Sequence, residues 1–99
     1  MKRERRLTAP DGKEIRVVFA TFPKGEGDIH GGTVLTPEGY LIAVNSNSPR
    51  RKQRHTLGHE LAHIFLAHFD LATGTLRKIE KEADAAAYRF YLRYRLRLL

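Results

Sequence analysis

The chain contains no cysteine, and this absence limits both its cross-links and its metal chemistry. Without thiols it can form neither disulfides nor thiolate metal sites, so any metal ion must be held by histidine, aspartate or glutamate. It also lacks any run of about 18 apolar residues, so we expect no transmembrane helix. The basic start, Met1 to Arg6, is followed by no apolar segment and does not resemble a secretory signal. We therefore expect a cytoplasmic protein.

The chain is short and basic. Its 99 residues suit one small domain, so we expect residues 1–99 to form a single domain. The formal net charge of +7 favours acidic partners, of which nucleic acid is the usual one. The charge is spread along the chain, however, and an ordinary solvated surface would show the same distribution.

The first half of the chain has the pattern of short strands joined by turns, and it holds all four prolines. Glu14–Phe22 is rich in β-branched and aromatic residues, which favour strands. Thr33–Leu35 and Tyr40–Val44 flank the turn signal Thr36–Gly39, a pattern typical of a hairpin. We predict a three-stranded antiparallel sheet from these segments, and a further strand at Arg5–Thr8 is compatible with the pattern.

The second half has the pattern of two helices. We predict the first from Pro49 to His68, capped by Ser48, with an apolar stripe on one face formed by Leu57, Leu61, Ile64 and Phe65. Asp70–Gly74 should break it, and a second helix should run from near Thr75 almost to Leu99. The predicted fold is therefore α+β, a small sheet followed by two helices in a minimal zincin-like arrangement.

The first predicted helix carries the motif His59-Glu60-Leu61-Ala62-His63. Residues four apart on a helix differ by about 40° in direction, so both imidazoles project from one face. Two imidazoles supply half of a tetrahedral zinc site, so His59 and His63 are predicted metal ligands. Glu60 points to the edge of that face, where a carboxylate could take a proton from a water activated by the metal. Histidines exposed on a helix without a metal are the simpler alternative.

A catalytic zinc needs a third protein ligand, and the second predicted helix offers three acids. Glu80 and Asp84 share a stripe beside an alanine-rich face that would let two helices approach closely. Glu82 instead groups with Lys78 and with two arginines further along the helix. We predict Glu80 as the third ligand, with Glu82 as the alternative. Asp84, one turn after Glu80, suits an acceptor for the N–H of a ligand imidazole.

Together these segments resemble the ImmA/IrrE family of metallopeptidases. The resemblance rests on the strand Leu41–Asn45, the basic stretch Arg50–Arg54, the Thr56-Leu57 pair before the His-Glu-x-x-His motif, and the later Glu80–Asp84. It covers roughly residues 30–92. The Glu-x-x-x-Asp part is also similar to gluzincins, where the first Glu is a zinc ligand, which agrees with Glu80.

The resemblance implies a cytoplasmic, zinc-dependent endopeptidase with Glu60 as its catalytic base. Members of the family typically cleave a helix-turn-helix repressor, so the implied partner is a protein that itself binds DNA. A substrate strand could add to a sheet edge near Gly31–Leu35, and His30, Tyr88 and Tyr91 are candidates for stabilising the oxyanion.

Two other functions fit the same sequence. One is a zinc-binding regulatory protein without catalysis. The other is a basic module that binds nucleic acid directly, supported by Arg50–Arg54 and by the arginines and tyrosines of residues 88–97. The sequence predicts neither a membrane partner nor an oligomeric state.

Overall fold

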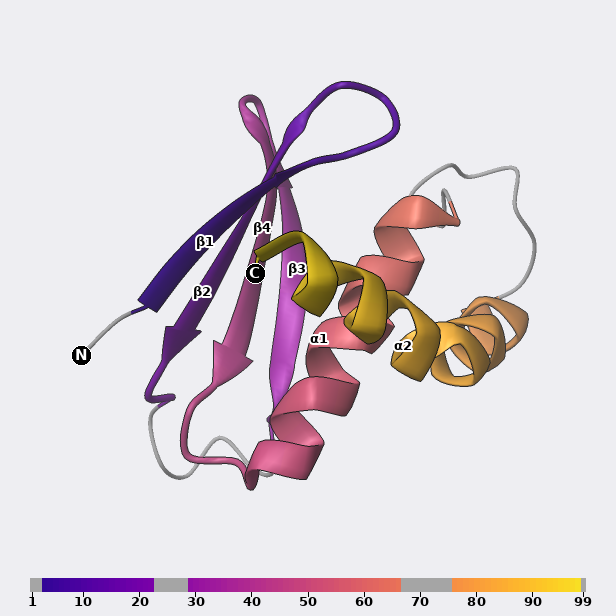
Figure 1. The fold of residues 1–99 in the computed structure, drawn as a ribbon. Helices are drawn as coiled ribbons and strands as arrows, with labels where there is room; N and C mark the ends of the chain where they lie inside the picture. Colours follow the sequence, from indigo (N-terminus) through magenta and orange to yellow (C-terminus); the bar gives the residue numbers. More distant parts are fainter. Residues whose placement is uncertain (1–2, 23–28, 67–75, 99) are drawn as a thin grey trace. The chain divides into compact units, whose positions relative to one another are not determined.

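The computed structural model describes residues 3–22, 29–66 and 76–98 of the chain. Its elements, in order, are β1 (Arg3–Thr8), β2 (Glu14–Ala20), β3 (Gly31–Thr36), β4 (Gly39–Asn45), α1 (Arg50–Phe65) and α2 (Leu76–Leu98) (Figure 1). The chain divides into two compact units, which we call the sheet unit (residues 1–53) and the helical unit (residues 54–99). Within the described residues, no helix has a stretch that is long and apolar enough to cross a membrane.

The sheet has four strands in the order β1-β2-β4-β3 and is mixed (Figure 1). The hairpin of β3 and β4 is present as predicted, and β1 pairs antiparallel with β2. The prediction of a three-stranded antiparallel sheet is wrong, because β2 and β4 run parallel. Parallel neighbours need a crossover connection, whereas antiparallel ones can be joined by a tight turn. The connection from β2 to β3 spans residues 21–30, so the chain can reach the far side of β4 before β3 begins.

The two central strands supply the aliphatic core of the sheet. Ile15 and Val17 on β2, and Ile42 and Val44 on β4, are 0% exposed. Each pair is two residues apart, so its side chains share one face of the sheet. Val17 lies directly opposite Ile42 in the parallel register. The alternation seen in the sequence therefore places the core, although it does not specify which strands are neighbours.

Gly39 begins β4 where the backbone of β2 comes very close. Its φ is +148°, and a Cβ at this position would overlap the backbone carbonyl oxygen of Glu14. Only glycine accepts both the conformation and the contact at low cost. This residue therefore helps to hold the start of β4 against β2, as the register of Glu14 opposite Gly39 shows.

The start of α1 differs in detail from the predicted cap. The helix begins at Arg50, one residue after the predicted start. The hydroxyl of Ser48 lies 2.8 Å from Nδ1 of His30. The side-chain amide of Gln53 reaches back and donates hydrogen bonds to the backbone oxygens of Ser46 and Ser48. Gln53 rather than Ser48 thus ties the first turn of the helix to the preceding loop.

In the helical unit, small residues bring α1 and α2 into close contact. A Cβ on Gly58 would overlap the carbonyl oxygen of Ala87 and would lie 2.7 Å from its carbonyl carbon. The rings of Phe65 and Phe90 stack at 5.5 Å between centroids. The alanine-rich face predicted for the second helix is buried, at Ala83, Ala86 and Ala87. The predicted break at Asp70–Gly74 lies outside the described residues.

Candidate metal centre

Helix α1 holds two imidazoles with their Nε2 atoms facing each other. His59 and His63 lie one turn apart, and their Nε2 atoms are 3.0 Å from each other. Their rings meet edge to face, with centroids 4.6 Å apart and an interplanar angle of 84°. Only 16% of the His59 side chain and 10% of the His63 side chain are exposed. Both rings are therefore fixed in place on a largely buried part of the helix.

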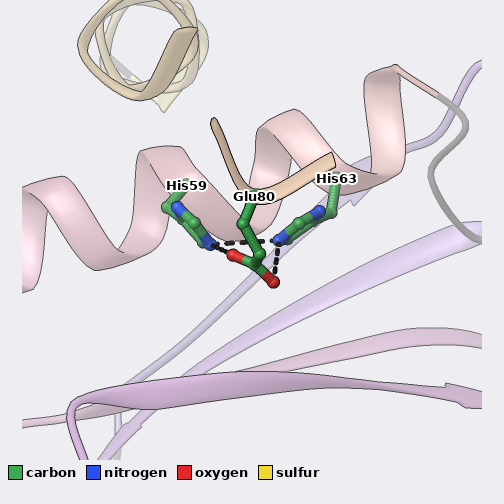
Figure 2. Close-up of side chains that lie close together, drawn as sticks. All are labelled: His59, His63 and Glu80. Carbon is green, nitrogen blue, oxygen red and sulfur yellow. Dashed lines mark hydrogen bonds and ion pairs between the residues drawn. The ribbon is translucent and has the colours of Figure 1, made fainter. Parts of the chain in front are cut away.

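Helix α2 adds a carboxylate to the same point (Figure 2). Glu80 Oε2 lies 2.8 Å from Nε2 of His59, and Oε1 lies 3.5 Å from Nε2 of His63. Each residue offers one donor atom, and these three atoms lie within 4.8 Å of one another. Two helices thus contribute three side chains capable of holding a metal ion to one small volume.

Asp84, one turn after Glu80, determines which nitrogen of His59 carries the proton. Its Oδ1 lies 2.7 Å from Nδ1 of His59. An ionised carboxylate can only accept, so Nδ1 must donate its hydrogen. In a neutral imidazole this leaves a lone pair on Nε2, the atom that faces Glu80 and His63. Asp84 therefore holds His59 with Nε2 toward Glu80 and His63, and its role behind a metal ligand stays a prediction.

The arrangement of the donor atoms is better suited to binding a cation than to hydrogen bonding among themselves. The His59 lone pair and a Glu80 carboxylate oxygen are both acceptors, and their close approach is repulsive unless a proton or a cation lies between them. In a tetrahedral site with ligand distances of about 2.0–2.1 Å, neighbouring donors lie about 3.3 Å apart. The two Nε2 atoms are 3.0 Å apart, and they lie 2.8 Å from Oε2 and 3.5 Å from Oε1 of Glu80, so these separations bracket that value. The group can accordingly hold a metal ion.

The other residues singled out in the sequence lie elsewhere. Glu60 is half-buried on α1, next in sequence to His59. Glu82, the alternative ligand, is exposed and does not belong to the converging group. Tyr88 is 72% exposed, and Tyr91 lies beside Gly58. Neither tyrosine joins the three ligands, and their role at an oxyanion stays a prediction.

His30, the third candidate for the oxyanion, lies in the sheet unit. It is half-buried, and its ring is engaged with the hydroxyl of Ser48, which is itself only 8% exposed. The backbone oxygen of His30 also accepts a hydrogen bond from the backbone N–H of Asn45. These contacts account for His30 locally, at the start of β3, and its role at an oxyanion also stays a prediction.

One neighbour of the site was not predicted. Nε2 of His55 lies 3.8 Å from Oδ1 of Asp84, and its ring centroid is 6.2 Å from that of His59. The signal was present in the sequence, because His55, His59 and His63 recur every four residues and must share one helix face. The carboxylate of Asp84 thus lies between two histidines of the same row.

Two histidines and a glutamate from a packed helix pair, with an aspartate behind one imidazole, form the kind of site found in metallopeptidases. The comparison with protein families agrees with this class. The family description of the IrrE N-terminal-like domain (Peptidase_M78) matches residues 11–97. The chain belongs to this family, which confirms the resemblance to ImmA/IrrE proteins. Comparisons with curated proteins and with solved structures found no match.

Proposed function

We propose that the chain is a zinc-dependent endopeptidase that cleaves a regulatory protein. The observation that carries the proposal is the convergence of His59, His63 and Glu80 at separations suited to a tetrahedral ion. Family membership supports the same chemistry. Zinc suits the donor set, because two imidazoles and one carboxylate are a common ligand group of catalytic zinc and leave a position open.

A zinc ion held there would supply Lewis acidity toward the scissile carbonyl and the attacking water. The chain's own contribution is to move the proton. The carboxylate of Glu60 takes a proton from the water as the water oxygen attacks the carbonyl carbon. The same carboxylate then delivers that proton to the amide nitrogen as the C–N bond breaks. Meanwhile Asp84 keeps its hydrogen bond to Nδ1 of His59, so His59 retains the orientation of a ligand.

The proposed substrate is an extended segment of protein that adds to the edge of the sheet at β3. The two edges of the sheet differ sharply in charge. β1 carries four charged residues in six, whereas β3 (Gly31–Thr36) carries none. Charged residues protect an edge strand from pairing with other chains. β3 lacks this protection and exposes Val34 and Leu35, by 59% and 48%, so its edge suits a peptide strand.

The proposed target is a repressor of the helix-turn-helix type, met in the cytoplasm. This part of the proposal rests on the family to which the chain belongs rather than on a contact in the structure. A catalytically silent zinc-binding protein is the alternative, and the same experiment distinguishes the two.

The test is to incubate the zinc-loaded chain with the helix-turn-helix regulator encoded beside its gene, and to follow cleavage by mass spectrometry. Cleavage should occur with zinc and stop with a chelator. Glu60→Gln should keep its zinc and lose at least about 100-fold in rate, because general acid–base catalysis contributes 10²–10⁴-fold. A Glu60→Gln variant that binds zinc and cleaves at the normal rate would contradict the proposed mechanism. Zinc binding without cleavage of the regulator would favour the silent binder.

A further inference from the structure

The solvent-facing side of α2 carries a row of three basic residues and one tyrosine that the metal site does not use. We propose that this row, Arg77, Lys81, Tyr88 and Arg95, binds the phosphate backbone of double-stranded DNA. The spacing of four, seven and seven residues places all four within about 40° of one another around the helix axis. All four are exposed, and Tyr88 is the most exposed large hydrophobic side chain among those described. We call this group the basic row.

The row lies opposite the buried side of α2. Ala83, Ala86 and Phe90 are buried, and on a helix wheel they lie on the other side from Tyr88. The guanidinium groups of Arg89 and Arg93 lie over the ring of Phe90, at 5.5 and 5.6 Å from its centroid. Both arginines are exposed but lie about 80–120° around the helix axis from Lys81, so they do not belong to the row.

The acids of α2 leave most of the row unopposed. All three acids lie between residues 80 and 84, and no acid follows Asp84 to the end of the chain. Glu80 and Asp84 face the imidazoles of His59 and His63 at the metal centre. Asp84 lies within about 20° of Arg77 and Arg95 around the helix axis, and its carboxylate is 2.7 Å from Nδ1 of His59. The C-terminal half of the helix therefore presents only positive charge.

The dimensions and chemistry of the row match a DNA backbone. From Arg77 to Arg95 the helix rises about 27 Å, which spans several phosphates of a duplex. Lysine, arginine and tyrosine are all common donors to phosphate oxygens. A membrane surface fits less well, because an interfacial helix needs a large exposed apolar face. Among the described residues of α2, Tyr88 alone is a large exposed apolar side chain.

The test measures binding of the full chain to a fluorescent 20-base-pair duplex by anisotropy, at several salt concentrations. The variant Arg77→Gln/Lys81→Gln/Arg95→Gln removes three charges from the row. The matched control Arg50→Gln/Arg51→Gln/Lys52→Gln removes three exposed charges from the first turn of α1. The row variant should bind at least about 10-fold more weakly and lose up to about 2.7 from its salt slope, at about 0.9 per phosphate contact. The control should change affinity by less than about threefold.

Equal losses in the two triple variants would overturn the proposal, because net charge alone would then explain binding. Displacement of the duplex by poly-glutamate of equal charge would also overturn it and would point to an acidic protein partner. If the row variant fails to fold by circular dichroism, Arg95→Gln alone provides the second test. Removing one charge of the row should weaken binding about two- to threefold and lower the salt slope by up to about 0.9, and an unchanged affinity would count against the row.

Discussion

The sheet unit and the helical unit differ in how their polar side chains are grouped. In the sheet unit, single donors meet single acceptors: the Tyr40 hydroxyl donates to Asp11, and the Asn45 amide donates to the Ile29 carbonyl oxygen. In the helical unit, Nδ1 of His59 likewise donates to Asp84, but the Nε2 atoms of two histidines and a carboxylate also converge on one point. We therefore expect the sheet unit to be complete with its own residues and the helical unit to gain stability when it binds a metal ion.

This contrast has a thermodynamic consequence. A ligand that binds only the folded state stabilises it in proportion to its affinity, by about 2.7 kcal/mol at 100 times the dissociation constant. We therefore expect zinc to protect the helical unit more than the sheet unit. Hydrogen exchange with and without zinc can measure the two units separately.

The largest effect should come from removing the third ligand. Glu80→Gln should weaken zinc binding by more than about 100-fold, because loss of even an indirect partner costs 10–100-fold. Glu82→Gln is the matched control on the same helix and should leave zinc affinity unchanged. Competition with a chromogenic chelator measures both. If Glu82→Gln instead caused the larger loss, the assignment of Glu80 would be wrong.

The second-largest effect should come from a substitution in the close contact between α1 and α2. Gly58→Ala should destabilise the chain by about 1–3 kcal/mol, because the new Cβ would overlap the backbone of Ala87, which cannot rotate away. Gly32→Ala in the sheet unit is the control, because nothing lies within 4 Å of a Cβ there. Urea unfolding of both variants measures the difference. Equal stability of the two would mean that α1 and α2 separate easily.

A smaller effect should follow from changing the residue behind the ligand. Asp84→Asn should weaken zinc binding about 10-fold, at the low end of the usual range, because 61% of the Asp84 side chain is exposed. The asparagine can still accept from Nδ1 of His59 but no longer carries a charge. Calorimetric titration with zinc measures the change. An affinity equal to that of the unchanged chain would show that the hydrogen bond matters and the charge does not.

The smallest effect lies in the sheet unit and depends on pH. The N–H of Lys13 and the Tyr40 hydroxyl donate to Asp11, and the backbone N–H in particular lowers the pKa of that carboxyl below 3.8. Its contribution to stability is therefore present above pH 3.8 and is lost as the pH falls through the lowered pKa. Asp11→Asn should cause a small loss at neutral pH that disappears in acid.

The same hydrogen bond between Tyr40 and Asp11 should also be lost at alkaline pH, when the phenol of Tyr40 ionises. Partial burial, and then its hydrogen bond to Asp11, raise the pKa of the Tyr40 phenol above 10.0. Its contribution is thus complete below pH 10.0 and is lost as the pH rises through the raised pKa. Urea midpoints of Tyr40→Phe and of the unchanged chain should converge at high pH. A constant difference across the whole range would contradict this account.

Much of the fold could be predicted from local patterns. The β3–β4 hairpin follows from the turn at Thr36–Gly39, and the start of α1 was predicted to within one residue. The second helix was predicted from near Thr75 almost to Leu99, and α2 runs from Leu76 to Leu98. The parallel pairing of β2 with β4 was missed, because nothing in either strand's own sequence specifies its neighbour.

For the candidate site as well, sequence spacing within one helix predicted part of the arrangement, and the packing of two helices determined the rest. The sequence alone determined that any ligands must be imidazoles or carboxylates, and that His59 and His63 share a face, because helical spacing is a local property. Helical spacing favoured Glu80 over Glu82, but only the tertiary structure showed that Glu80 reaches the two histidines and that Glu82 does not. That choice depends on how α2 packs on α1 at Gly58 and Ala87, where two backbones touch. Packing between distant segments depends on side-chain shape, and sequence spacing does not encode it.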